Sequence, residues 1–115
     1  MKLPKIIAIT INENEGVFSL DLSPELEVFQ GHFPGHPILA GVVQLDWAMQ
    51  LAVEYLGNNQ RVAQEFKVKF HRIIKPNVPL SLTLQLNRAK GRLFFTYRTS
   101  DQIMSSGQIT LKVES

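Results

Sequence analysis

Apolar residues follow two different spacings along the chain, and each spacing predicts a different kind of element. Residues 6–11 are rich in β-branched side chains and residues 17–22 alternate between apolar and polar, which predicts two strands joined by a short turn. Residues 29–37 are dense in glycine and proline, which excludes a regular helix there. A helix is predicted over about residues 39–56, and Gly57 ends it.

After the helix the spacing changes to two residues. Phe66 and Phe70 alternate with lysines, which predicts a strand with the phenylalanines on its core face and the lysines on its opposite face. Leucines alternate through residues 80–86, and residues 92–98 and 103–113 are predicted as two further strands. Sequential strands joined by short loops predict one antiparallel sheet.

The predicted helix is apolar nearly all the way round. Such a helix has to be covered on most of its sides. The simplest arrangement is an α+β fold, in which a curved antiparallel sheet wraps around one long central helix and residues 1–115 form a single domain. A helix too apolar for its own sheet to cover also predicts a dimer.

Composition narrows the class of protein without indicating a function. Hydrophobic residues make up 44% of the chain and charged residues 19%, which is typical of a globular domain and not of a disordered segment. The chain has no cysteine, which excludes a disulfide scaffold, a thiolate metal site and a cysteine nucleophile.

The net charge of +2 hides a division between the two halves of the chain. Residues 1–60 have two lysines and seven acidic residues, a net charge of −5, and residues 61–115 have ten basic and three acidic residues, a net charge of +7. If the second half builds a basic surface, its partner is a nucleic acid, an anionic lipid or an acidic protein. A nucleic acid is not expected, because Phe66 and Phe70 are predicted on the face opposite the lysines. The alternative is that the charges pair across strands within the fold.

Residues 38–56 are long enough to cross a membrane, but they contain the carboxylates Asp46 and Glu54 and two glutamines. Carboxylates are costly in lipid, so a helix buried in protein is expected instead. The N-terminal residues lack the long apolar region and the cleavage site of a secretory signal. We therefore expect a cytoplasmic protein without a membrane span.

Few side chains offer chemistry, and the strongest candidates are His32, Gly41 and Asp46. A metal site using His32 and His36 requires a helix between them, which Pro34 excludes, so no metal is expected. A histidine facing a carboxylate can take a proton from carbon and deliver one to a leaving group. The alternatives are a structural histidine in a turn and a solvated helix face. Gly41, near the helix start, has an amide free to bind a developing oxyanion.

Residues 31–50, GHFPGHPILAGVVQLDWAMQ, resemble the signature of the 3-hydroxyacyl-[acyl-carrier-protein] dehydratases. The resemblance implies a hot-dog fold, in which an antiparallel sheet wraps around a helix and two subunits join through their sheets. Residues 43–48 are most similar to the small dehydratases of aryl-polyene-type lipid pathways. Two positions depart from the usual signature: the acid is Asp46 and not the glutamate of the dehydratase-only branch, and Ala40 replaces a proline.

The resemblance also implies a role for each matching residue. His32 matches the catalytic histidine, Asp46 the catalytic acid, and Gly41 the glycine whose amide holds the thioester carbonyl. In the family the histidine and the acid of one site come from opposite subunits, which implies a homodimer, a heterodimer with a paralogue, or a higher oligomer. The residues expected along the substrate channel are Phe33, Pro34, Trp47 and Met49.

The implied reaction converts a (3R)-hydroxyacyl thioester on acyl-carrier protein to a trans-2-enoyl thioester, in fatty-acid or aryl-polyene-type lipid biosynthesis. No metal ion or nucleotide cofactor is expected, because the substrate arrives on the phosphopantetheine arm of the carrier. Carrier proteins of this kind are acidic, so the basic half of the chain is expected to dock them. The expected docking residues are Arg61, Lys67, Lys69, Arg72, Lys75, Arg88, Lys90 and Arg92.

Two alternative functions remain open. A hot-dog thioesterase would use Asp46 to activate water for attack on the thioester carbonyl, but this leaves His32 unexplained. A non-catalytic hot-dog subunit would keep the fold and bind acyl-carrier protein. The presence of both His32 and Asp46 at the matching positions argues against such a loss of activity.

Overall fold

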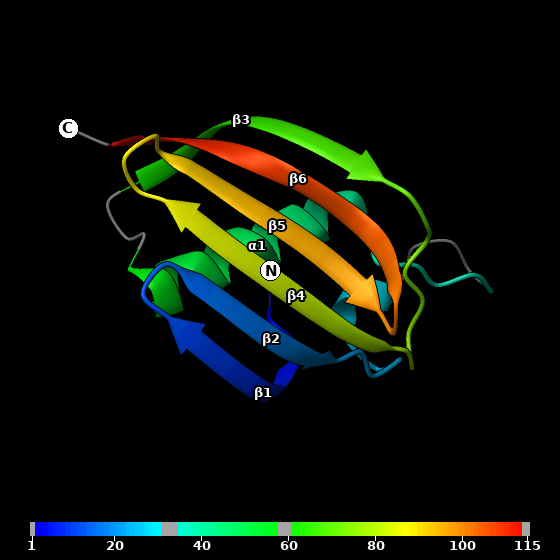
Figure 1. Cartoon of the computed structure of the whole chain (residues 1–115). Helices are drawn as coiled ribbons and strands as arrows, with labels where there is room; N and C mark the ends of the chain where they lie inside the picture. The colour runs from blue at the N-terminus through cyan, green and yellow to red at the C-terminus, as the bar shows by residue number, and fades with distance from the viewer. Residues whose placement is uncertain (1, 31–34, 58–60, 114–115) are drawn as a thin grey trace.

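The computed structural model of the chain describes residues 2–30, 35–57 and 61–113. Two strands and a short 3-10 helix precede one long helix, and four strands follow it (Figure 1). The strands are β1 (Lys5–Asn12), β2 (Glu15–Asp21), β3 (Arg61–Phe70), β4 (Pro79–Asn87), β5 (Arg92–Thr99) and β6 (Gln102–Val113). The helices are η1 (Glu27–Phe29) and α1 (Gly41–Leu56).

The six strands form one sheet in the order β1-β2-β4-β5-β6-β3, and every neighbouring pair is antiparallel. Helix α1 lies across one face of this sheet and packs mainly against β4 and β2 (Figure 1). The two outermost strands are β1 and β3. The predicted arrangement of one long helix against one antiparallel sheet is therefore confirmed.

The alternation of apolar residues decides which face of each strand meets the helix. All four leucines of β4 are buried, whereas the residues between them are half-buried or exposed. Each buried leucine side chain contributes roughly 1.5–3 kcal/mol relative to an exposed one. Phe18 of β2 and Phe95 of β5 share the same core with Trp47 and Leu51 of α1. The core thus lies between the centre of the sheet and one side of the helix.

The two ends of α1 differ in their local sequence. The helix begins at Gly41, slightly later than predicted, and ends at Leu56 as predicted. Ala40, the residue before the helix, has an extended backbone and makes no side-chain hydrogen bond to the first amides. Gly57 after the helix has a φ of 69°, a left-handed conformation that glycine adopts without the steric cost met by other residues.

The sheet covers α1 from one side only, which leaves apolar side chains exposed. Val42 of the helix is 62% exposed, and Phe66 and Phe70 of β3 are 47% and 55% exposed. Neither phenylalanine is therefore buried within a single chain. Their face is nevertheless the predicted one, because Phe70 lies against Gly41 and Phe66 pairs with the buried Ile109. They are exposed because β3 is an edge strand, away from the strands on which the helix packs.

Candidate active site at the start of the helix

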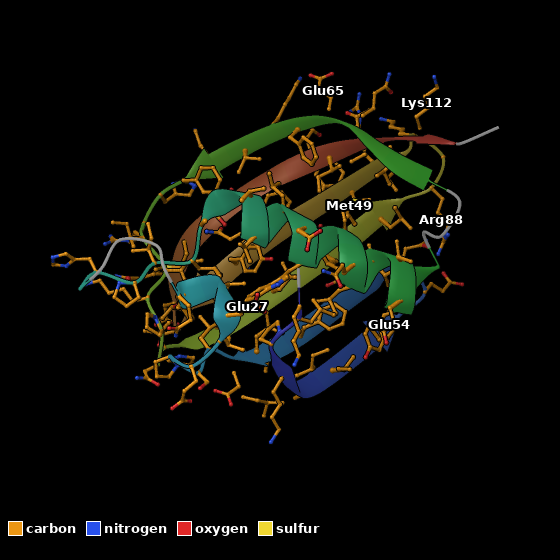
Figure 2. All side chains as sticks on the ribbon, turned by 180° about the vertical axis from the view of Figure 1, so that it is seen from behind. Glu27, Met49, Glu54, Glu65, Arg88 and Lys112 are labelled. Atoms are coloured by element: carbon orange, nitrogen blue, oxygen red, sulfur yellow. The ribbon has the colours of Figure 1, made fainter. Side chains whose placement is uncertain are left out.

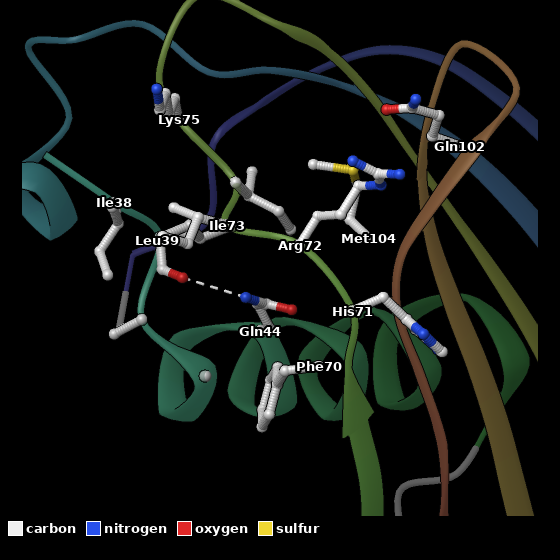
Figure 3. Close-up of a pocket in the computed structure, with 13 residues that line it drawn as sticks. Ile38, Leu39, Gln44, Phe70, His71, Arg72, Ile73, Lys75, Gln102 and Met104 are labelled. Carbon is white, nitrogen blue, oxygen red and sulfur yellow. Dashed lines mark hydrogen bonds between the residues drawn. The ribbon is translucent and has the colours of Figure 1, made fainter.

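A cavity of about 770 Å³ opens beside the N-terminal end of α1 (Figure 3). The segment leading into the helix lines one part of it, and the connection between β3 and β4 lines another. Its lining residues are Ile38, Leu39, Ala40, Gly41, Gln44, Phe70, His71, Arg72, Ile73, Ile74, Lys75, Gln102 and Met104. The cavity therefore combines an apolar wall with positive charge.

Gly41, the first residue of α1, brings a backbone donor to this cavity. The first helical amide with a partner in the described part of the chain is that of Val43, which donates to the Ala40 carbonyl at 3.1 Å. No hydrogen bond between described residues uses the Gly41 amide. A Cβ atom at Gly41 would lie 2.5 Å from Cζ of Phe70, so the ring occupies the space a side chain would need. Among the described residues, the Gly41 N–H thus has no hydrogen-bond partner, and it lies at the positive end of the helix dipole.

Asp46 lies about a turn and a half further along the helix. The buried residues of α1 are on its other side, so Asp46 faces away from the sheet. Its side chain is half-buried, and Nε2 of Gln50 donates a hydrogen bond to its Oδ2 at 2.7 Å. Asp46 and Gln50 thus form a hydrogen-bonded i, i+4 pair on the helix, which orients the carboxylate. Because Asp46 does not line the cavity at Gly41, one chain alone does not bring the two together.

Gln44 is a polar side chain of α1 that the sheet buries, with 3% of its surface exposed. Its Nε2 donates to the Leu39 carbonyl at 3.0 Å, and its Oε1 accepts from the Ser105 hydroxyl at 2.6 Å. Its backbone carbonyl accepts from the Tyr97 hydroxyl at 2.6 Å. Sequence reasoning missed Gln44 as a site residue. The available signal was its position on the apolar side of the predicted helix, one turn before Ala48.

Tyr97 is fully buried on β5 and directs its hydroxyl at the helix. Burial and, to a lesser degree, the negative charge of Asp46 raise the pKa of Tyr97 well above its usual value. The phenol therefore stays protonated at neutral pH and keeps its hydrogen bond to the backbone of Gln44.

The predicted channel residues lie in separate places. Trp47 is fully buried in the core, and its Nε1 donates to the Lys2 carbonyl at 3.1 Å. Met49 is half-buried on the outer side of the helix (Figure 2). Neither side chain lines the cavity at Gly41. Three predicted site residues lie outside the described residues, and their roles stay predictions: His32, Phe33 and Pro34.

Comparison with known proteins identifies the family. The family model named ApeI-like, described as ApeI dehydratase, matches residues 8–108. The chain belongs to the ApeI-like dehydratase family. A solved structure, the dehydratase heterocomplex ApeI:P from Xenorhabdus doucetiae, has a chain that is 35% identical to this ApeI-like chain, with a TM-score of 0.89. The match covers 96% of this chain and 98% of that one, and the expected hot-dog fold is confirmed.

Curated relatives of this ApeI-like chain are named 3-hydroxyacyl-[acyl-carrier-protein] dehydratase FabZ. The relative from Natranaerobius thermophilus is 33% identical over 91 residues, which is 70% of this chain and 64% of the relative. The relative from Novosphingobium aromaticivorans is 29% identical over 119 residues, which is 95% of this chain and 72% of the relative. The chain thus spans less than two thirds of the length of the first relative. The resemblance carried by residues 31–50 is confirmed at the level of the family.

The expected docking residues of the ApeI-like chain lie in different regions. Arg72 and Lys75 line the cavity, on either side of the exposed Ile73. The other described side chains do not line the cavity: Lys67, Lys69 and Arg92 are on the sheet face opposite the helix, and Arg88 and Lys90 are in the β4–β5 turn. The side chain of Arg61 is outside what the structure describes. Two of the seven candidates whose side chains are described therefore line the cavity.

Three further findings complete the description of this ApeI-like chain. His36 is exposed and, with Ile73 and Lys75, lines a second cavity of about 490 Å³ beside the first. Among the described residues, no three His, Cys, Asp or Glu side chains form a group that could hold a metal ion. No helix within the described ranges is long and apolar enough to cross a membrane.

Proposed function

We propose that this ApeI-like chain dehydrates (3R)-hydroxyacyl thioesters on acyl-carrier protein to trans-2-enoyl thioesters, in fatty-acid or aryl-polyene-type lipid biosynthesis. The observation that carries the proposal is the free amide of Gly41 on the cavity wall. Such a donor suits the carbonyl oxygen of a thioester, on which negative charge develops when the neighbouring carbon loses a proton. The names of the family and of the relatives support the same reaction.

In the proposed reaction, the Gly41 amide donates to the thioester oxygen while His32 takes the α-proton. The electrons of the broken C–H bond gather on that oxygen, where the amide and the helix dipole stabilise the enolate. They then form the carbon–carbon double bond as the bond to the β-hydroxyl breaks, and a proton from Asp46 lets the hydroxyl leave as water. The oxyanion donor contributes about 10²–10³ in rate and acid–base catalysis about 10²–10⁴.

The proposed active unit is a dimer. Asp46 faces away from the sheet and does not line the cavity at Gly41, so a second subunit is needed to bring an acid to the cavity. The exposed apolar surface of Val42, Phe66 and Phe70 offers a place for that subunit. The partner is a second copy of this chain or a paralogue. The Xenorhabdus doucetiae relative is itself part of a heterocomplex.

Mixing two inactive variants, His32→Ala and Asp46→Asn, tests the shared site. If His32 of one subunit works with Asp46 of the other, each hybrid dimer has one intact site of two. Activity is then expected to return after the two proteins are dissociated and reassociated together. If both residues act within one chain, every site of the hybrid is damaged. A mixture that stays inactive although mass spectrometry shows hybrid dimers would contradict the proposal.

Carrier-protein docking is proposed at the cavity mouth. Arg72 and Lys75 flank Ile73, which is 60% exposed, so positive charge surrounds an apolar contact where the phosphopantetheine arm would enter. The double variant Arg72→Ala/Lys75→Ala is expected to raise KM for the carrier-bound substrate and to weaken its dependence on salt. A carrier-free thioester should be affected little. Lys90→Ala, in the β4–β5 turn, is the matched control and should change neither KM for the carrier-bound substrate nor its dependence on salt.

Mass spectrometry of a (3R)-hydroxyacyl carrier protein after incubation with the protein tests the reaction itself. Loss of one water molecule from the carrier-bound acyl group supports dehydration. Release of the free carrier thiol indicates a thioesterase, and an unchanged carrier indicates a binding subunit. Because dehydration is reversible, the enoyl carrier protein is incubated as well. Absence of any hydration or dehydration in both directions would contradict the proposed function.

A further inference from the structure

The buried polar cluster around Gln44 has no part in the reaction described above, although Gln44 lines the cavity (Figure 3). Burying a side-chain amide costs free energy unless its groups are hydrogen-bonded. Gln44 is bonded at both ends of its amide, to Leu39 on one side and to Ser105 on the other. A leucine would fill a core position without needing either partner. Burial alone therefore does not explain a glutamine at this position.

The partners of Gln44 determine the orientation of its side-chain amide. The Leu39 carbonyl can only accept a hydrogen bond, so Gln44 must direct its NH₂ group there. The Ser105 hydroxyl donates to the remaining oxygen. The Tyr97 hydroxyl donates to the backbone carbonyl of Gln44 and fixes this turn of the helix against β5. A buried network with all these groups satisfied favours one conformation.

The bond to Leu39 connects Gln44 to the peptide groups before Gly41. The Leu39 amide donates to the Ile74 carbonyl at 2.8 Å and the Leu39 carbonyl accepts from Gln44, so both backbone groups of Leu39 are held. The Ala40 carbonyl accepts from the backbone amide of Gln44 at 3.2 Å. The Gly41 N–H lies in the same rigid peptide plane as the Ala40 carbonyl. Holding these groups therefore fixes the direction of the Gly41 N–H.

We propose that Gln44 is a positioning residue, which holds residues 39–41 so that the Gly41 amide points at the thioester oxygen. This inference rests on the proposed function, because that function gives the Gly41 amide its role. Gln44 acts through the Leu39 carbonyl, and contact with the substrate is not required. A misplacement of about 1 Å can cost on the order of 10²-fold in rate. Loss of the bond is therefore expected to lower kcat more than it raises KM.

Three variants separate positioning from core stability. Gln44→Leu removes both side-chain bonds, whereas Ser105→Ala removes only the bond on the sheet side and keeps the bond to Leu39. The substrate is the N-acetylcysteamine thioester of (3R)-3-hydroxyoctanoate, and the protein is the assembled oligomer. We expect kcat to fall about tenfold to a hundredfold in Gln44→Leu with little change in KM. In Ser105→Ala, kcat is expected to stay near the wild-type value.

The third variant, Gln44→Glu, is expected to keep the hydrogen bond to Leu39 only while its carboxyl group is protonated. A protonated carboxyl at this position donates to the Leu39 carbonyl, and an ionised one repels it. Burial favours the protonated form, so the ratio of variant to wild-type kcat is expected to be highest at low pH and to fall as the pH rises. Dividing by the wild-type kcat removes the pH dependence that the two proteins have in common. The ionisable groups around this position in both proteins are Asp46, His71, Arg72, Lys75 and Tyr97.

A readout that does not require turnover completes the experiment. The amide resonance of Gly41 in ¹⁵N-labelled protein is expected to shift in Gln44→Leu and to stay in place in Ser105→Ala. Equal losses of kcat in these two variants, or an unmoved Gly41 resonance in Gln44→Leu, would overturn the proposal. If Gln44→Leu does not fold, a ratio in Gln44→Glu that stays far below one at every pH overturns it instead. Absence of dehydratase activity in the wild-type protein would contradict the proposed function. The Gly41 resonance would then still show whether Gln44 positions the Gly41 amide.

Discussion

The two ends of helix α1 are built in opposite ways. At the C-terminal end, Gly57 turns the chain in a left-handed conformation, and Arg88 donates a hydrogen bond to the Leu56 carbonyl (Figure 2). At the N-terminal end, Ala40 provides no side-chain cap, and Gly41 lines the cavity that Figure 3 shows. The chain thus closes one end of the helix with its own groups and leaves the other end open.

This difference separates stability from function along one helix. A side-chain cap typically stabilises a helix by about 1 kcal/mol, and the N-terminal end does without it. The guanidinium of Arg88 lies at the negative end of the helix dipole, where a cation is favourable. Proteins commonly accept reduced stability where a site needs free groups. Variants at the open end should therefore change activity, and variants at the closed end should change stability.

The largest effect is expected from Asp46→Asn, the acid on the outer face of the helix near its open end. We expect kcat to fall by about 10²–10⁴-fold, because the amide of asparagine cannot deliver the proton. The fold and the oligomeric state should be unchanged, since an asparagine oxygen can still accept the hydrogen bond from Gln50. Circular dichroism checks the fold, and light scattering checks the oligomeric state. Glu54→Gln, about two turns further along the same helix, is the matched control. Unchanged turnover in Asp46→Asn would remove Asp46 from the mechanism.

The second effect concerns the close approach of Gly41 and Phe70. In Gly41→Ala the new methyl group would meet the Phe70 ring at 2.5 Å, so the helix start or the ring has to move. We expect kcat to fall about tenfold to a hundredfold if the amide is displaced from the thioester oxygen. Adding Phe70→Ala to this variant removes the clash and should restore part of the activity. A double variant no better than Gly41→Ala would show that the ring does not control the amide.

The closed end should respond in stability alone. Arg88→Ala removes the bonds from the guanidinium to the Leu56 carbonyl and to Oδ1 of Asn14. We expect the free energy of unfolding to fall by about 1 kcal/mol. Hydrogen bonds from a charged group can contribute more, but this side chain is exposed and solvent weakens its interactions. Urea denaturation measures the change, and kcat per folded protein should be unaffected. Lys90→Ala in the same turn is the control, and an equal loss there would contradict a specific role for Arg88.

The comparison also shows which features the sequence allowed us to predict. The strands were predicted because alternation over a few residues reports directly which face of a strand is apolar. The end of the helix was predicted from Gly57, and the family from a contiguous signature at residues 31–50. The start of the helix was placed slightly early, because Leu39 continues the apolar pattern and no capping residue marks the boundary.

The features that were missed depend on contacts between residues far apart in the sequence. Gln44 bonds with Ser105, and Arg88 with Leu56, and neither pairing leaves a trace in local periodicity. Alternation placed Phe66 and Phe70 on the correct face but could not predict their burial. Burial depends on the position of β3 at the edge of the sheet, which is set by the order of the strands. Sequence patterns thus predicted elements and faces, whereas strand order and pairing required the structure.

The smallest expected effect comes from capping the open end. Ala40 has the extended backbone of an N-cap residue, so Ala40→Ser and Ala40→Asp should each accept a hydrogen bond from the amide of Val42 or Val43. Each is expected to stabilise the protein by about 0.5–1 kcal/mol in urea denaturation. The Gly41 amide lies before the capped amides and stays free, so Ala40→Ser should keep the wild-type kcat.

Ala40→Asp should differ from Ala40→Ser in activity but not in stability. Its carboxylate adds negative charge beside the thioester oxygen, which itself becomes negative in the enolate, so kcat should fall several-fold and partly recover at high salt. Comparing Ala40→Ser with Ala40→Asp therefore separates the contribution of this helix end to stability from its contribution to catalysis. If Ala40→Ser lowers kcat as much as Ala40→Asp, the capped amides and not Gly41 alone hold the oxyanion. If neither variant gains stability, the missing cap is not what makes this end of the helix weaker than the end held by Arg88.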